Sequence, residues 1–409
     1  MPTFELMSKL IGDKAKTPAE IVTKVVGALH SLDTLKDKAL DKALDTVQRS
    51  LEQMKSCIFG DEGHEPTKAN VVALAEEVVR SDLLALVPGK LLALGFETRK
   101  DAAQVFGAVV RIRDNEDKCP GAHYVEQHFE IMEELFNGYK EPSIALNCGS
   151  MFRDCIRDEG VARRVLDSDI LWRFFDEVEV ANFEIASDAF SSFKDLLTRH
   201  KGAIARFLAD HFQRFFDAFY GLLQSSNYVT RRQSLKLLGE LLLDGINVRL
   251  MMRYVSDVRN LMLMMNLLKD SSRSIQFEAF HVFKVFVANP SKPQPIIDIL
   301  TNNRDKLLKY LEDFLPERDD DEQFKEEKAV ILKEISKLGR SEGGTPAAAP
   351  AEGAPRSEGG GGGGEQQPGA GGSGGGSTAD QQEAQQQQQQ QAAPGAALEE
   401  PEPMATGAP

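Results

Sequence analysis

Two cations one helical turn apart are the residues of this sequence whose types and spacing favour binding of a charged ligand. Arg232 and Lys236 lie in the stretch NYVTRRQSLKLLGELLLD, residues 227–244, together with a third basic residue, Arg231. A guanidinium binds a carboxylate through two parallel hydrogen bonds, and a lysine ammonium adds a point charge beside it. These cations are therefore candidate docking points for an acidic partner, and the alternative is an ordinary solvated helix face.

The same stretch has the pattern of one amphipathic helix. Four leucines recur at spacings of three and four residues and predict a core-facing stripe: Leu235, Leu238, Leu241 and Leu242. Arg232 and Lys236 fall on roughly the opposite side, where Gly239 would let the backbone of a ligand approach closely. Within residues 261–268, Met262, Met264 and Met265 occupy adjoining positions, so at least one should point away from the core.

An internal repeat predicts the architecture that positions this helix. The segments 183–197, 228–242 and 273–287 each begin 45 residues after the one before, and residues 143–156 are a fourth, earlier copy. A period of about 40–47 residues is typical of armadillo and HEAT units, which bury their apolar faces by stacking on each other. We therefore predict an all-α fold, a right-handed α-solenoid of armadillo/HEAT-like helical repeats. In such a solenoid the last helix of each repeat lines the concave groove, which places the two cations there.

Helix start and stop signals are frequent, and no stretch of the body has a strand pattern. TPAE at residues 17–20 predicts a helix start with a capping threonine and a proline in the first turn. ANP at 288–290 predicts a helix end, and Pro88-Gly89 predicts a break between two helices. About fifteen to eighteen helices with short connections are expected.

Composition and charge divide the chain into a helical body and a tail. The 409 residues are 42% hydrophobic and carry a net charge of −15, of which the nine acids and one arginine after residue 340 supply about half. An acidic body argues against a surface that follows nucleic-acid phosphates. The glycine- and glutamine-rich tail cannot bury enough apolar surface to fold. We expect a flexible segment (1–14), a helical-repeat scaffold (15–340) and a disordered tail (341–409).

The sequence gives no sign of a metal site, a cofactor or a membrane anchor. Four cysteines without C-x-x-C spacing are expected to be structural and reduced: Cys57, Cys119, Cys148 and Cys155. The most apolar stretch, residues 83–96, is interrupted by Pro88, Gly89 and Lys90 and is too short to span a bilayer. No apolar block followed by a cleavage site opens the chain. We expect a cytoplasmic protein without cofactor or metal.

Four blocks also carry a resemblance to a known family. IALNCGSMFRDCIR, ASDAFSSFKDLLTRHK, NYVTRRQSLKLLGELLLD and IQFEAFHVFKVFVANP resemble the calcium-binding protein 39 family, the mouse-protein-25 scaffolds, over about residues 16–337. The resemblance implies a catalytically inert adaptor whose concave face binds a protein kinase or pseudokinase and stabilises its active conformation. Partners implied by the family are kinases of the sterile-twenty-like or nuclear-Dbf2-related class. The calcium in the family's name has no counterpart here, because no D-x-D-x-D-G loop is present and ERDDDEQFKEE, residues 317–327, lacks the glycine.

The resemblance also implies two sets of site residues. A C-terminal pocket that binds a Trp-Glu-Phe tail of the partner matches at Arg232, Lys236 and Met265, and more weakly at Lys306. On the concave kinase-facing surface Phe183 and Tyr228 match, whereas Gly245 and Val248 stand where the animal pattern has Arg and Phe. At the pocket edge Asn302 replaces a lysine.

Two other functions remain as alternatives. A HEAT-like peptide carrier would repeat Trp and Asn along its groove, and a HEAT-like DNA glycosylase would need a basic face with base-stacking aromatics. The sequence has one tryptophan and an acidic body, which disfavours both. Kinase activity is excluded because no V-A-I-K, H-R-D or D-F-G motif is present. We expect a chain that is monomeric without its partner, binds no nucleic acid and does not insert into membranes.

Overall fold

The computed structural model describes residues 17–61, 65–318 and 320–339. The predicted flexible segment (1–14) and the predicted disordered tail (341–409) lie outside these residues, so both stay predictions. The described helices fall into two units, one ending at Ser291 and the other beginning at Lys292.

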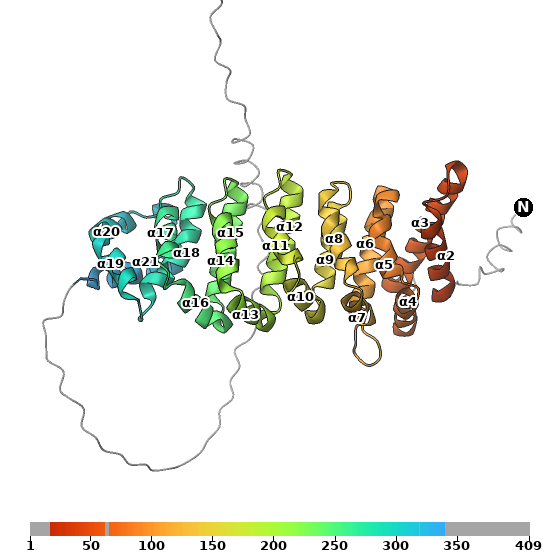
Figure 1. The fold of residues 1–409 in the computed structure, drawn as a ribbon, viewed down its shortest axis with the longest axis horizontal. Helices are drawn as coiled ribbons and strands as arrows, with labels where there is room; N and C mark the ends of the chain where they lie inside the picture. The colour runs from red at the N-terminus through yellow and green to blue at the C-terminus, as the bar shows by residue number, and fades with distance from the viewer. Residues whose placement is uncertain (1–16, 62–64, 319, 340–409) are drawn as a thin grey trace, which may run out of the picture. The chain divides into compact units, whose positions relative to one another are not determined.

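The regular elements of the described residues are helices (Figure 1). The first unit contains α2 (Pro18–Ser31), α3 (Asp37–Phe59), α4 (Lys68–Arg80), α5 (Leu83–Lys90), η1 (Leu91–Ala93), α6 (Phe96–Arg111), α7 (Pro120–Gln127), α8 (Glu130–Asn137), η2 (Gly138–Lys140), α9 (Ala145–Cys155), α10 (Glu159–Leu166), α11 (Ile170–Glu177), α12 (Phe183–Thr198), α13 (Lys201–Asp210), α14 (Phe212–Leu223), α15 (Tyr228–Leu243), η3 (Gly245–Asn247), α16 (Val248–Tyr254), α17 (Val258–Leu267) and α18 (Arg273–Ala288). The second contains α19 (Gln294–Asn302), α20 (Arg304–Glu312), η4 (Pro316–Arg318) and α21 (Glu322–Lys337), with α20 packed on α21.

The first unit is built from stacked three-helix repeats, which confirms the predicted all-α solenoid of armadillo/HEAT type. The third helix of each repeat packs against the third helix of the next repeat, and together they form one row: α3, α6, α9, α12, α15 and α18. The first helices of the repeats form a second row, α4, α7, α10, α13 and α16. Figure 1 shows these repeats following one another along the first unit.

The predicted 45-residue register is present in the structure. α12, α15 and α18 each have 16 residues and begin at Phe183, Tyr228 and Arg273. The residue before each start caps the helix, because the side chains of Asn182, Asn227 and Ser272 accept hydrogen bonds from backbone amides of the first turn. The positions that coincide in the sequence alignment are buried in all three helices: Ala189, Ser234 and Ala279; Phe190, Leu235 and Phe280; Phe193, Leu238 and Phe283.

Ion pairs join successive third helices. The strongest geometry is that of Arg153 on α9, whose Nη1 and Nη2 donate to the two carboxylate oxygens of Asp188 on α12, both at 2.8 Å. Such a two-pronged pair fixes the register between neighbouring helices. The other members of the row are Lys55–Asp101 at 2.6 Å, Arg111–Asp154 at 3.1 Å and Lys194–Glu240 at 2.8 Å.

Arginines stacked on aromatic rings also join successive repeats, and the rings lie on, or at the start of, the second helices α8, α11 and α14. Each arginine comes from one repeat and covers a ring of the repeat before it, which adds attraction and packing of the guanidinium stem. The pairs, with the distance from guanidinium carbon to ring centroid, are Arg164–Phe129 at 4.6 Å, Arg173–Phe136 at 4.4 Å, Arg214–Trp172 at 3.7 Å, Arg253–Phe212 at 3.9 Å and Arg259–Tyr220 at 5.0 Å.

Arg214→Ala is expected to lower the free energy of unfolding by about 1 kcal/mol, because Trp172 loses its cation and its cover. Trp172 is the single tryptophan of the chain, so its fluorescence reports on this contact directly. The measurement is urea denaturation followed by that fluorescence. Arg206→Ala on α13 is the control, since Arg206 is exposed and its bond within the described residues is a local one, to the Gly202 carbonyl. Equal stability of both variants and the wild type would contradict a role for the stack.

Two predicted helix boundaries are confirmed. Thr17 caps α2 in a reciprocal arrangement with Glu20, and Pro18 is the first helical residue. At the other end of the unit α18 ends at Ala288, with Asn289 at the C-cap before Pro290.

The prediction of a helix break at Pro88-Gly89 is wrong, because both residues lie inside α5. Pro88 omits one backbone hydrogen bond, which an eight-residue helix tolerates close to its end. The expected number of helices was also too low, since the described residues contain 20 α-helices. Several short helices meet without a Pro or Gly between them; only His211 separates α13 from α14.

Cys148 and Cys155 are buried, as predicted for small core residues, while Cys57 and Cys119 are half-buried; all four are free thiols. Burial raises the pKa of the Cys148 thiol to about 12, so it is protonated at neutral pH. Among the described helices, none is long and apolar enough to cross a membrane.

Candidate functional site

α15 is the element that positions the two predicted cations. Its predicted core stripe is confirmed, because Leu235, Leu238, Leu241 and Leu242 are all at most 3% exposed. With that stripe buried, Lys236 is exposed to solvent and Arg232 is half-buried. The helix therefore presents both cations away from its leucine core, one turn apart.

α18 places an aromatic pair at the positions equivalent to these cations. Phe277 and His281 lie 45 residues after Arg232 and Lys236, and α15 packs against α18. Their rings are 4.4 Å apart in an edge-to-face arrangement, and both side chains are half-buried. We call Arg232, Lys236, Phe277 and His281 the α15–α18 face. The sequence interpretation missed its aromatic half, although the 45-residue alignment contains the signal.

The methionines of α17 divide between core and surface. Met264 is fully buried, Met262 is 45% exposed and Met265 is half-buried. The expectation that at least one of them points away from the core is confirmed. Met265 is thus accessible in part, and its flexible thioether can adapt to an apolar ligand.

Two residues beside the cations have structural roles instead of the predicted binding roles. Arg231 donates from Nη1 to the Ser225 carbonyl at 2.7 Å, and its Nη2 lies 3.4 Å from Asp270. It therefore holds the turn before α15 and is not a docking point. Gly239 is buried, and a side chain there would point toward Val282 of α18, so its position does not admit a ligand backbone.

Phe183 and Tyr228 are the first residues of α12 and α15 and so occupy equivalent positions of the repeat. Phe183 is half-buried, and Tyr228 is only 5% exposed. Little of the Tyr228 ring is accessible to a partner. Its assignment to the kinase-facing surface stays a prediction, as does that of Phe183.

Gly245 and Val248 form an exposed edge just beyond the end of α15. Gly245 opens η3, and a Cβ added there would meet no atom within 4 Å. Val248 opens α16 and is 51% exposed. Their neighbours Leu243 and Ile246 are 53% and 52% exposed, so three apolar side chains of this short segment are accessible. We call residues 243–248 the η3 edge.

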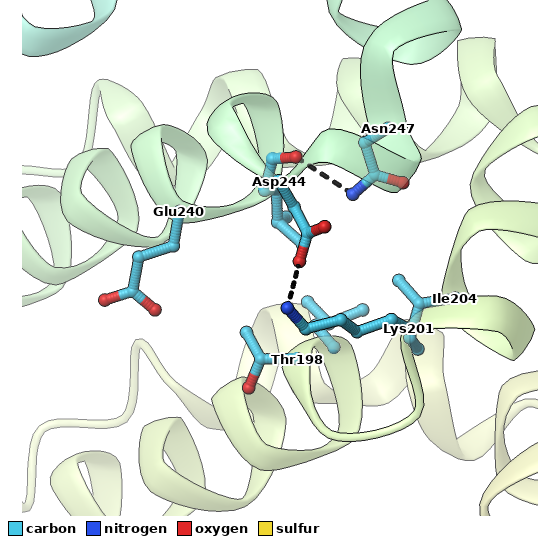
Figure 2. Close-up of a pocket in the computed structure, with 8 residues that line it drawn as sticks. Thr198, Lys201, Ile204, Glu240, Asp244 and Asn247 are labelled. Atoms are coloured by element: carbon cyan, nitrogen blue, oxygen red, sulfur yellow. Dashed lines mark hydrogen bonds and ion pairs between the residues drawn. The ribbon is translucent and has the colours of Figure 1, made fainter. Parts of the chain in front are cut away.

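A cavity of about 200 Å³ lies beside the η3 edge (Figure 2). Asp244 is its central acid: its carboxylate accepts from the Ile246 amide at 3.1 Å and pairs with Lys201 of α13 at 2.8 Å. The hydrogen bond from Lys201 and the Ile246 amide hold the pKa of Asp244 below its usual range. The lining residues are Leu197, Thr198, Lys201, Ile204, Glu240, Leu241, Asp244 and Asn247.

Two residues of the predicted pocket belong to the second unit. Lys306 is exposed on α20, and Asn302 is exposed at the end of α19. The assignment that joins Lys306 to Arg232, Lys236 and Met265 in one pocket stays a prediction.

Comparison with known proteins identifies the family. The model of the Mo25-like family matches residues 9–339. The chain belongs to the Mo25-like family. The Degreening-related gene dee76 protein of Auxenochlorella protothecoides is 55% identical over 73% of this chain and 92% of its own length. Calcium-binding protein 39-like of Mus musculus is 48% identical over 80% of this chain and 97% of its own length. The Mo25-like protein of Schizosaccharomyces pombe is 40% identical over 81% of this chain and 100% of its own length.

The name of the mouse relative refers to calcium, but this Mo25-like chain offers no donor cluster among its described residues. No group of three or more His, Cys, Asp or Glu side chains there is arranged to hold a metal ion. In the acidic run that begins at Glu317, Asp321 accepts a hydrogen bond from the Phe324 amide at 3.1 Å and so caps α21. This carboxylate has a structural role.

Proposed function

We propose that this Mo25-like protein is a non-catalytic scaffold that binds a protein kinase or pseudokinase and stabilises its active conformation. Membership of a family of scaffold proteins and the stacked-repeat fold support this proposal. The single observation that carries it furthest is the α15–α18 face, where two cations on α15 and an aromatic pair on α18 occupy equivalent positions of neighbouring, packed repeats.

The chemistry of this face suits the C-terminal hydrophobic tail of a partner. A Trp-Glu-Phe tail offers two aromatic anchors, one side-chain carboxylate and, at a chain end, a second carboxylate. Arg232 and Lys236 can bind the carboxylates, while Phe277 and, from α17, which packs against α18, Met265 can contact the rings. Buried aromatic anchors and arginine contacts are the usual sources of binding energy in protein interfaces.

A second contact surface is proposed at the η3 edge with Phe183, since Tyr228 is almost fully buried. The family resemblance makes kinases of the sterile-twenty-like or nuclear-Dbf2-related class the candidate partners, with the kinase domain bound here and the tail at the α15–α18 face. Mixing the purified chain with such a kinase tests the proposal, since a scaffold of this kind raises kinase activity without adding any of its own.

The double variant Gly245→Arg, Val248→Phe is expected to raise activation of an animal sterile-twenty-like kinase without changing affinity for the tail peptide. Arg at 245 has open space and Phe at 248 replaces a half-exposed Val, so the fold accommodates both. Each new contact is worth about 1–3 kcal/mol at an interface centre. The measurements are a kinase assay and fluorescence anisotropy with a Trp-Glu-Phe peptide.

A matched control is Gly202→Arg on α13, where a new side chain also has open space and the residue is exposed. It adds the same charge outside the η3 edge. If the wild type, the control and the double variant activate the kinase equally, positions 245 and 248 do not contact it.

A further inference from the structure

The outer side of α16 presents aliphatic groups and cations together. The helix buries Leu250 and Tyr254, which lie one turn apart on its inner side. The residues that the helical period places away from these two are exposed or half-buried: Val248, Arg249, Met252 and Arg253. We call these four residues the α16 face.

The charge of the α16 face is positive. α16 contains no acid, and Arg249 has no ion-pair partner among the described residues. Arg253 is stacked on an aromatic ring of α14 at 3.9 Å, which leaves its charge without a carboxylate. The acids that flank α16 in the chain are engaged elsewhere, since Asp244 pairs with Lys201 at 2.8 Å and Asp257 caps α17. The face is therefore a local cationic surface on a chain whose net charge is −15.

The neighbours of the α16 face keep it accessible and positive. η3 and α13 both pack against α16, and Figure 1 shows α13 and α16 at the same edge of the first unit. In η3, Ile246 is 52% exposed and adds an accessible aliphatic group just before the face. In α13, the exposed acid Asp210 is outnumbered by the exposed cations Lys201 and Arg206. An acidic segment with aliphatic side chains therefore matches this surface.

Residues 398–404, LEEPEPM, are the stretch of the tail with this chemistry. Leu398 and Met404 are the sole leucine and methionine between residues 341 and 409, where Val, Ile, Phe, Tyr and Trp do not occur. Three of the nine acids of the tail lie between these two: Glu399, Glu400 and Glu402. The stretch has no aromatic anchor, so it suits the aliphatic α16 face better than the α15–α18 face.

The tether is long enough for this stretch to reach the face. About 60 residues separate Gly339 from Leu398, and they are rich in glycine. A glycine-rich coil of that length has a root-mean-square end-to-end distance of about 40 Å, roughly four helix diameters. A segment tethered in this way is present at an effective concentration on the order of 1 mM, so even a weak contact is occupied.

We infer that residues 398–404 bind the α16 face of the same chain. The carboxylates pair with Arg249 and Arg253, and the aliphatic side chains pack on Val248 and Met252. The bound stretch covers Val248, which belongs to the surface proposed for the kinase domain, and so competes with the kinase. This competition rests on the proposed function, whereas the binding itself does not.

The test of the binding compares two full-length chains as receptors for a labelled peptide of residues 396–409. One is the wild type, and the other is the neutral-end variant Glu399→Gln, Glu400→Gln, Glu402→Gln. Fluorescence anisotropy should show the peptide binding the neutral-end variant about tenfold more tightly, because the wild-type tail occupies the face. Adding Arg249→Glu to the neutral-end variant should weaken the peptide at least tenfold. Equal binding by the two chains, or no effect of Arg249→Glu, would overturn the inference.

A matched control removes the same charge from the other end of the tail: Glu342→Gln, Glu352→Gln, Glu358→Gln. This chain should bind the peptide like wild type; a gain equal to that of the neutral-end variant would show a general charge effect and refute the binding. Lys118→Glu, in the loop between α6 and α7, is the control for Arg249→Glu and should leave peptide binding unchanged. Circular dichroism melting checks that each variant is folded.

A vesicle assay distinguishes the tail from a membrane as the ligand of this cationic and aliphatic face. Sedimentation of the neutral-end variant with phosphatidylserine vesicles should show no binding that depends on Arg249. Vesicle binding that Arg249→Glu removes, together with no binding of the peptide, would assign the face to anionic lipid and overturn the inference.

A kinase assay tests the competition separately. The neutral-end variant should activate a sterile-twenty-like kinase several-fold more than wild type does, and equal activation would overturn the competition. Peptide binding without kinase activation by either chain would refute the proposed function and leave the binding standing. Kinase activation by wild type without peptide binding would do the reverse.

Discussion

Gly149→Ala should lower the free energy of unfolding by about 3 kcal/mol, although alanine is the better helix former by about 1 kcal/mol. Gly149 lies within α9, and a Cβ there would overlap the Asp188 carboxylate of α12 and come within 2.5 Å of the Tyr139 hydroxyl. The Asp188 carboxylate accepts two bonds from Arg153 and one from Tyr139, the last at 3.0 Å. Displacing it would leave the largely buried Arg153 and Tyr139 without their carboxylate, with the Ser192 hydroxyl, at 2.9 and 2.8 Å, as a neutral partner.

Gly27→Ala in α2 is the control with the opposite sign, since Gly27 is exposed and a Cβ there meets no atom within 4 Å. It should stabilise the protein by about 0.5–1 kcal/mol through helix propensity alone. Urea denaturation followed by circular dichroism gives both values. A gain in stability for both variants would mean that Asp188 moves away from Gly149 at no cost.

Arg232→Ala and Met265→Ala should each weaken binding of a peptide ending in Trp-Glu-Phe by about 2 kcal/mol, roughly 30-fold in Kd. The arginine variant leaves a carboxylate without its charged partner, and the methionine variant removes packing around a ring. Fluorescence anisotropy with the labelled peptide measures both.

Gln233→Ala is the control for this pair, because Gln233 is the exposed neighbour of Arg232 on α15 and carries no charge. It should bind the peptide like wild type. Should both test variants also bind like wild type, the α15–α18 face would be an ordinary solvated surface and its assignment as the tail site would be withdrawn.

The repeat architecture was predictable because similar segments of the sequence recur at a constant interval of 45 residues. Residues at one position of a stacked helix meet the same neighbours in every repeat, so Ala189, Ser234 and Ala279 share one environment and one size class. Capping signals act within a few residues, which is why Thr17 and Pro290 gave correct boundaries. Pro88 failed as a signal because the backbone hydrogen bond that it omits falls close to the end of the short helix α5.

The details of the candidate site depend on contacts between repeats, which spacing does not reveal. Arg231 is held by Ser225 in the loop between α14 and α15 and by Asp270 in the loop between α17 and α18 of the next repeat, and neither contact follows from the spacing of the sequence. The cavity beside Asp244 likewise arises where α12, α13, α15 and η3 meet, and the sequence contains no motif for it. The family resemblance predicted a role for Gly245 and Val248, next to that cavity, but none for Asn247.

The most direct test of the scaffold proposal is affinity purification of the tagged chain from its own cells, followed by mass spectrometry. Wild type should recover a protein kinase or pseudokinase, and the double charge reversal Arg232→Glu, Lys236→Glu should lose it. Lys118→Glu, in an exposed loop between α6 and α7, should retain it. Failure to recover any kinase or pseudokinase with wild type, or equal recovery with the charge-reversed variant, would contradict the proposed function.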